Sequence, residues 1–212
     1  RFVGNVRSVE SLMTQSRRKD MANTTQRPHT IVLCCSDSRA PAEIVFDQGL
    51  CDLFVVRVAG NVVSPTLIGS IEFAAVKFGT PLVVVMGHSQ CGAVTATLEA
   101  SLFGKSAPSA NIQSIVDRIL PQVKQITQED APMEELLSKS IRANIHASVK
   151  TLHEFSPILQ DLICQGKLAV VGAKYCLESG KVEFFEETLH ETTLPQESQT
   201  LPKAAHFEGS RA

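Results

Sequence analysis

The sequence predicts an α/β fold with a mostly parallel central sheet flanked by helices. Short runs of Val, Ile and Leu without polar alternation are typical of strands that are buried on both faces of a parallel sheet. Longer segments with helical spacing of apolar residues lie between these runs, and strands that alternate with helices form such sheets. The chain has 212 residues, of which 43% are hydrophobic, so it is long enough for one domain with a substantial core.

Four apolar runs are predicted as the parallel strands. They lie at residues 31–35, 53–58, 82–86 and 168–171. A fifth strand is predicted at residues 181–186, after a turn at Ser179 and Gly180. We expect this last strand at the edge of the sheet, near the C-terminus.

Helices are predicted between the strands from their boundary residues and spacing. Ser64 is expected to cap a helix that has Pro65 at its first position. Gly79 can end this helix, because glycine readily adopts the left-handed backbone of a C-terminal cap. Further helices are predicted at residues 92–103, 111–128 and 133–155.

The two ends of the chain differ from its centre. Residues 1–26 are polar and are predicted to form an N-terminal helical arm, and residues 191–212 a loose C-terminal tail. Residues 27–190 are then the α/β domain, which we expect to carry any functional site. Because the first residue is Arg1 rather than Met, we expect the natural N-terminus, with any targeting segment, to lie upstream.

Charge and cysteine content narrow the class of protein. Lys and Arg number 20 and Asp and Glu 22, so a formal charge of -2 gives no electrostatic reason to expect nucleic acid or a membrane surface as a partner. No apolar run approaches the ~20 residues that span a bilayer. The six cysteines are expected to be free thiols or metal ligands, because a chain of this size needs no disulfides. This favours a reducing compartment, and we predict a cytoplasmic location.

Two short segments carry the residues with chemical potential. Residues 35–39 read Cys-Ser-Asp-Ser-Arg after the first strand, and residues 87–92 read Gly-His-Ser-Gln-Cys-Gly after the third. Open α/β sheets place their ligands at these carboxyl ends of strands. The thiolates of Cys35 and Cys91 with the imidazole of His88 form a ligand set that suits Zn²⁺. Three protein ligands leave a fourth position for water, which is typical of a catalytic zinc site.

Asp37 and Arg39 are predicted to support this site. They are two residues apart, and the arginine fork can bind the carboxylate through two hydrogen bonds. An aspartate paired in this way stays ionised and is held back from the metal. It can therefore accept a hydrogen bond from water or hydroxide on the zinc.

Simpler roles are expected for the other cysteines. Successive strand residues point to opposite faces, so Cys34 is predicted to face the core while Cys35 faces the site. A lone buried cysteine behaves as a small hydrophobic residue. Cys51, Cys164 and Cys176 are therefore predicted to be inert.

A competing interpretation makes Ser89 a nucleophile. A strand followed by Gly-His-Ser-Gln-Cys and then a helix is similar to the nucleophile elbow of α/β-hydrolases. The last glycine of that motif is Cys91 here, and the chain is short for that fold. The hydrolase interpretation also leaves the pattern of residues 35–39 unexplained.

The two segments resemble the β-class carbonic anhydrase family, whose signatures are Cys-x-Asp-x-Arg and His-x-x-Cys. Both signatures are complete in this chain. The similarity continues through residues 53–61 and 69–73, and more weakly through residues 172–184. The resemblance covers residues 26–100 most strongly.

The resemblance assigns roles residue by residue. It implies that Cys35, His88 and Cys91 hold the metal and that Asp37 and Arg39 form the catalytic dyad. It also implies a substrate pocket, and the family positions of that pocket fall on Gln26, Phe54, Ala59, Phe73 and Gly92. Phe73 replaces a tyrosine of other members, and Ala59 replaces the valine of some.

The implied activity is that of a lyase. It is the reversible hydration of carbon dioxide to bicarbonate and a proton by attack of a zinc-bound hydroxide, with one Zn²⁺ per chain. The resemblance also implies a homodimer or tetramer in which the arm clasps a partner, so that Gln26 reaches the partner's site. Two alternatives stay open, a related hydrolase of carbonyl sulfide or carbon disulfide and a non-catalytic zinc-binding protein.

Overall fold

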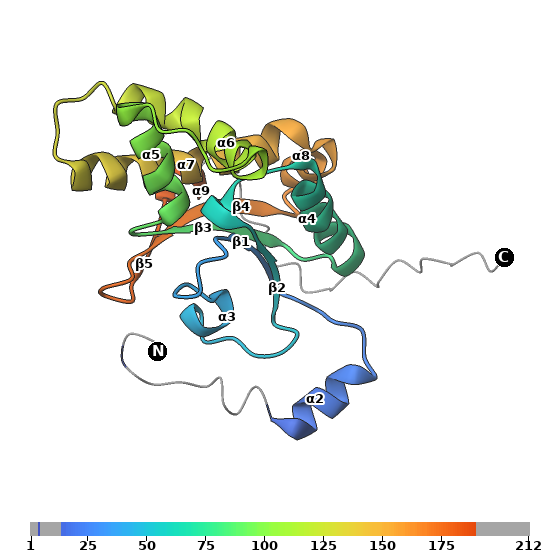
Figure 1. Cartoon of the computed structure of the whole chain (residues 1–212). Helices are drawn as coiled ribbons and strands as arrows, with labels where there is room; N and C mark the ends of the chain where they lie inside the picture. The colour runs from blue at the N-terminus through green and yellow to red at the C-terminus, as the bar shows by residue number, and fades with distance from the viewer. Residues whose placement is uncertain (1–3, 5–13, 190–212) are drawn as a thin grey trace.

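The computed structural model describes residue 4 and residues 14–189, and its centre is a five-stranded sheet in the order β2-β1-β3-β4-β5 (Figure 1). The strands are β1 (Thr30–Cys34), β2 (Leu53–Arg57), β3 (Leu82–His88), β4 (Ala169–Tyr175) and β5 (Val182–Phe184). The first four are parallel, and β5 pairs antiparallel with β4. The predicted fold class and the predicted edge strand are confirmed.

Two strands are longer than their apolar runs. The ladder between β3 and β4 extends from Leu82 opposite Ala169 to His88 opposite Tyr175. The apolar runs stop earlier because Gly87 and Gly172 interrupt them, whereas backbone pairing does not depend on the side chain. As a result His88 is the last residue of a strand rather than part of the following loop.

Helices cover the sheet unequally. One face carries a layer of five helices (Figure 1), which are α4 (Pro65–Phe78), α5 (Gly92–Phe103), α6 (Ala110–Ile126), α7 (Met133–Phe155) and α8 (Pro157–Cys164). The other face is covered by the short α3 (Ala42–Val45). The remaining elements are α2 (Gln15–Ala22), the 3-10 turn η1 (Ala59–Asn61) and α9 (Glu186–Leu189).

The predicted helix boundaries agree with the structure at most positions. Ser64 is the N-cap residue of α4 and Pro65 its first helical residue, although the Ser64 side chain makes no capping hydrogen bond. Gly79 and Gly104 end α4 and α5 in the left-handed conformation, with φ of 65° at each. The bounds of α7 match the prediction, but α3, α8 and α9 were not predicted, and α9 begins where the last strand was expected to end.

The pleat of β1 divides the core into two clusters. Ile31, Leu33 and Cys35 face the helical layer, whereas Val32 and Cys34 pack on the face that carries α3. All five are buried, as a strand at the centre of a parallel sheet requires. The prediction that Cys34 faces the core on the side opposite Cys35 is confirmed.

The ends of the chain are described only in part. Within the predicted arm, α2 is an exposed helix whose Arg17 forms an ion pair of 2.9 Å with Asp52. The first part of the arm and the tail predicted at residues 191–212 lie outside the described residues. Over residue 4 and residues 14–189, no helix combines the length and the hydrophobicity that a membrane span requires.

We expect Gly172→Ala to destabilise the fold. An added methyl group would lie 2.9 Å from Cδ2 of Phe185 and 3.1 Å from Cγ2 of Ile145, and both side chains are fully buried. Overpacking of this kind costs about 1–3 kcal/mol, so the midpoint of urea unfolding should fall. Gly69→Ala is the matched control, because no atom lies within 4 Å of the methyl group that it adds. Equal midpoints for the two variants would contradict this account of the packing.

Candidate metal centre

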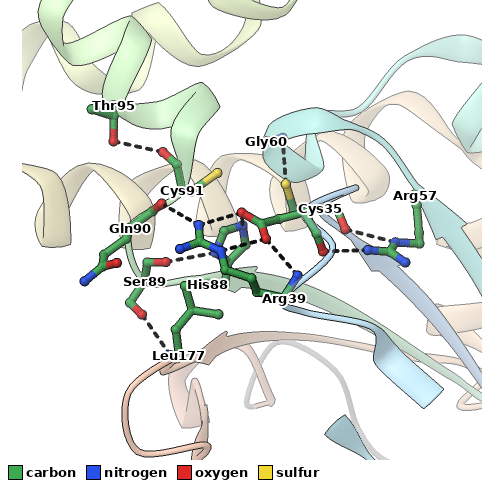
Figure 2. Close-up of polar contacts among 11 residues, drawn as sticks. Cys35, Arg39, Arg57, Gly60, His88, Ser89, Gln90, Cys91, Thr95 and Leu177 are labelled. Carbon is green, nitrogen blue, oxygen red and sulfur yellow. Dashed lines mark hydrogen bonds and ion pairs between the residues drawn. The ribbon is translucent and has the colours of Figure 1, made fainter. Parts of the chain in front are cut away.

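Cys35 lies one residue beyond the end of β1, at the carboxyl edge of the sheet. The backbone around it is fixed by two bonds to Val58, which donates its N–H to the carbonyl of Cys34 and accepts the N–H of Ser36. The Cys35 sulfur is buried and accepts a hydrogen bond of 3.3 Å from the N–H of Gly60 in η1 (Figure 2). This sulfur therefore has a fixed position and a donor that stabilises its thiolate form.

His88 ends β3 on the neighbouring strand and is almost fully buried. Its Nδ1 lies 2.8 Å from the carbonyl oxygen of Ser89. A carbonyl only accepts, so Nδ1 carries the proton and Nε2 presents a lone pair. Among the residues that the structure describes, Nε2 is buried without a hydrogen-bond partner, which is costly unless a further group binds it.

Cys91 is the N-cap residue of α5 and is buried. Gln90 makes the tight turn before it with φ of 55°, so that the chain reverses from β3 into the helix. The contact with Cys35 and burial raise the pKa of Cys91 overall, although the backbone amides of Val94 and Ala93 in the first turn of α5 act to lower that pKa. A helix N-terminus also attracts negative charge, so this position suits a thiolate.

The three side chains converge on one point. The sulfurs of Cys35 and Cys91 and a ring nitrogen of His88 all lie within 4.8 Å of one another. A tetrahedral zinc with Zn–S bonds of about 2.3 Å would place two ligand sulfurs about 3.8 Å apart. The distances, the burial and the free lone pair of His88 therefore fit a zinc ion, and the predicted ligand set is brought together by the fold.

The two thiols shift each other's pKa in opposite directions. The hydrogen bond between Cys91 and Cys35, together with the smaller contributions of the Asp37 and Gly60 amides, lowers the pKa of Cys35 to about 4. The same contact with Cys35, followed by burial, raises the pKa of Cys91. By contrast, burial raises the pKa of the Cys34 thiol to about 12. The surroundings of Cys35 thus favour a thiolate, whereas those of the adjacent Cys34 favour the neutral thiol.

Asp37 and Arg39 form the predicted fork. Nε of Arg39 donates to Oδ1 of Asp37 at 3.0 Å and Nη2 donates to Oδ2 at 2.7 Å, while the Arg39 backbone N–H also bonds Oδ1. These hydrogen bonds hold the pKa of Asp37 well below its usual value. Oδ2 lies 3.8 Å from Nε2 of His88, so the ionised carboxylate stands beside the ligands while the arginine restrains it.

Arg57 is a site residue that the sequence reasoning did not identify. It ends β2, and its guanidinium donates to the carbonyl oxygen of Cys35 at 3.1 Å and to that of Asp37 at 2.8 Å (Figure 2). One side chain therefore fixes the backbone of both signature residues. The available signal was a charged residue at the end of an apolar run, but such residues usually project into solvent.

Ser89 does not have the contacts of a nucleophile. Its hydroxyl accepts a hydrogen bond of 2.9 Å from the N–H of Leu177 in the turn before β5 (Figure 2). The neighbouring imidazole of His88 bonds the carbonyl oxygen of Ser89 and not its hydroxyl. The hydroxyl thus links the β4–β5 turn to the site.

The predicted pocket residues are spread over the chain. Ala59 adjoins Gly60 in η1, and Gly92 follows Cys91 at the start of α5, so both lie next to the ligands. Gln26 precedes β1 whereas Cys35 follows it, and five strand residues span about 17 Å. Phe54 and Phe73 both pack against Phe78, with ring centroids 6.2 and 5.6 Å away, and 52% of Phe73 is exposed. Their role as pocket residues stays a prediction.

Comparison with known sequences points to one family. The sequence model of the family described as carbonic anhydrase matches residues 30–182. A protein named carbonic anhydrase 2 from Mycobacterium tuberculosis is 38% identical over 156 residues, which cover 74% of this chain and 73% of that protein. A carbonic anhydrase from Mycolicibacterium smegmatis is 39% identical over 166 residues, which cover 78% of this chain and 79% of that protein.

Solved structures show the same fold. The β-carbonic anhydrase CcaA has a TM-score of 0.71 at 25% identity, over 85% of this chain and 90% of that chain. A structure from a study of two tetrameric β-carbonic anhydrases of Sordaria macrospora has a TM-score of 0.70 at 22% identity, over 79% of this chain and 85% of that chain.

The Asp37–Arg39 pair should make a contribution to stability that depends on pH. A carboxylate with a lowered pKa in the folded state stabilises the protein above its unfolded pKa of about 3.9, and this stability is lost as pH falls toward the folded value. Asp37→Asn should therefore destabilise the metal-free protein near neutral pH, by an amount that shrinks below about pH 4. Urea unfolding at several pH values measures the difference.

The same substitution in an Arg39→Gln background is the control for this experiment. Without the guanidinium the pKa of Asp37 should lie closer to its usual value, so the pH-dependent part of the difference should largely disappear. A difference between wild type and Asp37→Asn that stays constant down to about pH 3 would show that the arginine does not hold this carboxylate.

Proposed function

Since this chain belongs to the β-carbonic anhydrase family, we propose that it hydrates carbon dioxide reversibly to bicarbonate and a proton with a zinc ion held by Cys35, His88 and Cys91. As a carbonic anhydrase it is a lyase. The single observation that carries the zinc site is the convergence of three buried ligand atoms within 4.8 Å of one another. The ionised Asp37 beside them supports a catalytic rather than a storage role.

The residues around the proposed zinc ion have different roles. When bound, zinc supplies a Lewis acid that lowers the pKa of water at its open position, which provides a nucleophile near neutral pH. With zinc in place, the ionised Asp37 carboxylate would accept a hydrogen bond from a water beside the ligands and so orient it for attack on carbon dioxide. Arg39 keeps Asp37 ionised and restrains it, because both carboxylate oxygens are bound by the guanidinium.

A second copy of the chain would complete the substrate pocket. Gln26 and Phe73 are placed away from Cys35 within one chain, at the other end of β1 and on the exposed side of α4. Exposed apolar side chains on α4 and at the end of α7, among them Val76 and Phe155, offer a surface for such a copy. We therefore propose a homodimer, or a tetramer built from dimers, in which these residues serve the partner's site.

The cysteines support the proposed location. All six cysteines are free thiols. Four of them, Cys34, Cys51, Cys164 and Cys176, do not belong to the proposed site. Free thiols persist in reducing compartments. We propose that the protein works in the cytoplasm.

The purified protein should contain about one zinc per chain, as three ligands and an open position predict. In Cys35→Ser combined with Cys91→Ser, most of this zinc should be lost, because hydroxyl groups are poor zinc ligands. Elemental analysis after gel filtration measures the content. Cys34→Ala is the matched control, because this buried cysteine faces away from the site and its loss should leave the zinc in place.

Activity separates the remaining functions. Stopped-flow measurement of carbon dioxide hydration should show turnover that falls with the zinc content. Stoichiometric zinc without hydration would instead favour the non-catalytic protein, and faster hydrolysis of carbonyl sulfide would favour the related hydrolase. Zinc that persists in the double serine variant would refute the ligand assignment.

Arg39→Ala should lower the turnover number about 10- to 100-fold while the protein still folds, since loss of a group that orients the metal's surroundings has effects of this size. The unpaired Asp37 would no longer be held back from the metal. Stopped-flow hydration at saturating substrate measures the loss. Arg142→Ala is the control, because Arg142 also binds two carboxylates, those of Glu183 and Glu187, away from the signature residues. Wild-type turnover in a soluble Arg39→Ala variant would show that the dyad takes no part in catalysis.

A further inference from the structure

We propose that Asn144 and Ser148 on α7 are positioning residues of the metal centre, which hold the turn η1 so that the Gly60 N–H bonds the Cys35 thiolate. The inference deepens the proposed function and rests on it, because the thiolate matters as a zinc ligand. The predictions from sequence gave no role to either residue. Their part follows from four features of the described structure, namely their burial, their bonds, the strain of η1 and the contact with Cys35.

The first feature is a buried polar line on α7. Ser140, Asn144 and Ser148 recur at every fourth residue, so they lie on one side of the helix. They are 0%, 2% and 4% exposed among apolar neighbours such as Ile141 and Ile145. Buried polar side chains are costly unless they form hydrogen bonds. Such a line on the core side of a helix therefore needs a reason.

The second feature is the pair of bonds that this line makes. Nδ2 of Asn144 donates to the carbonyl oxygen of Gly60 at 2.8 Å, and Oγ of Ser148 donates to the carbonyl oxygen of Asn61 at 3.0 Å. One turn of α7 thus binds two successive carbonyls of η1. The partners are 84 and 87 residues apart in the chain, so these bonds form only when α7 packs on the sheet.

The third feature is the strain of the bound turn. Gly60 has φ of 71° and Asn61 has φ of 44°, so two successive residues adopt the left-handed region. For a residue with a side chain this region is costly and persists where the surroundings enforce it. The space is tight as well, since a Cβ on Gly60 would lie 2.9 Å from Cδ1 of Ile119 and 3.0 Å from Cβ of Ala93.

The fourth feature is the hydrogen bond that the strained turn donates to Cys35. In this conformation the Gly60 N–H points at Sγ of Cys35 from 3.3 Å (Figure 2). A hydrogen bond to a thiolate withdraws electron density from the sulfur and fixes its orientation. Groups that orient metal ligands in this way commonly change metal affinity about 10- to 100-fold. Ala59 belongs to the same turn, so the bonds from α7 also place one of the predicted pocket residues.

The test is zinc affinity, measured by competition with a chromophoric chelator. Asn144→Ala should bind zinc about 10- to 100-fold more weakly than wild type. Ser148→Ala should change the affinity in the same direction by a smaller factor, and it is the variant to use if Asn144→Ala fails to fold. Ser140→Ala is the matched control, because its hydroxyl lies on the same side of α7 and makes no hydrogen bond to any residue that the structure describes.

A spectrum separates positioning from mere stability. In protein loaded with Co²⁺, the charge-transfer band from thiolate to metal should move to lower energy in Asn144→Ala and Ser148→Ala, because a sulfur that loses a hydrogen bond donates more strongly. Ser140→Ala should keep the wild-type band.

Wild-type affinity and a wild-type cobalt band in both variants, whatever their stability, would overturn the inference. A wild-type protein that binds neither zinc nor cobalt would overturn the proposed function itself. The two failures therefore have different signatures.

Discussion

The parallel pairing of β1 with β3 is the constraint on which the candidate metal centre depends. The ladder runs from Ile31 opposite Val83 to Cys34 opposite Met86, so Cys35 leaves the sheet at the edge where β3 continues through Gly87 to its last residue. His88 then stands one residue beyond Gly87, and the turn into α5 returns Cys91 to the same point. Residues that are more than fifty positions apart become neighbours because strands of equal direction end together.

Two arginines at this edge of the sheet have different roles, one toward charge and one toward the backbone. Two thiolates and a carboxylate within one small region would repel one another in the absence of cations. Arg39 binds the carboxylate of Asp37, whereas Arg57 binds backbone carbonyls of Cys35 and Asp37. One arginine therefore sets the ionisation state of the aspartate, and the other sets the shape of the loop that carries it.

The sequence was sufficient for the fold class, the strands and the convergence of Cys35, His88 and Cys91, because these follow from apolar runs and from the edge at which parallel strands end. It was not sufficient for short elements. α3 and α9 have four residues each, too few to show a periodic pattern, and only Ser156 separates α8 from α7, so the two patterns merge. Ser156 did carry a signal, since its hydroxyl caps α8 ahead of Pro157.

The support of the site was harder to predict than its ligands. Asn144 and Arg57 act through backbone groups of residues far away in the chain, and no local pattern records such contacts. Gln26 and Phe73 present a different problem, because their proposed place is in a neighbouring subunit. The proposed pocket lies between two chains, so the fold of one chain does not by itself bring Gln26 and Phe73 to Cys35.

The opposite orientation of Cys34 and Cys35 has a consequence for how the proposed zinc ion would be acquired. In a newly made chain these two vicinal thiols are chemically equivalent, and a thiophilic ion would capture either one. The pleat of β1 removes the equivalence by burying Cys34 against Val32 and Ala42 on the far side of the sheet. The strand, and not the identity of an ion, therefore decides which of the two neighbouring thiols can serve as the proposed ligand.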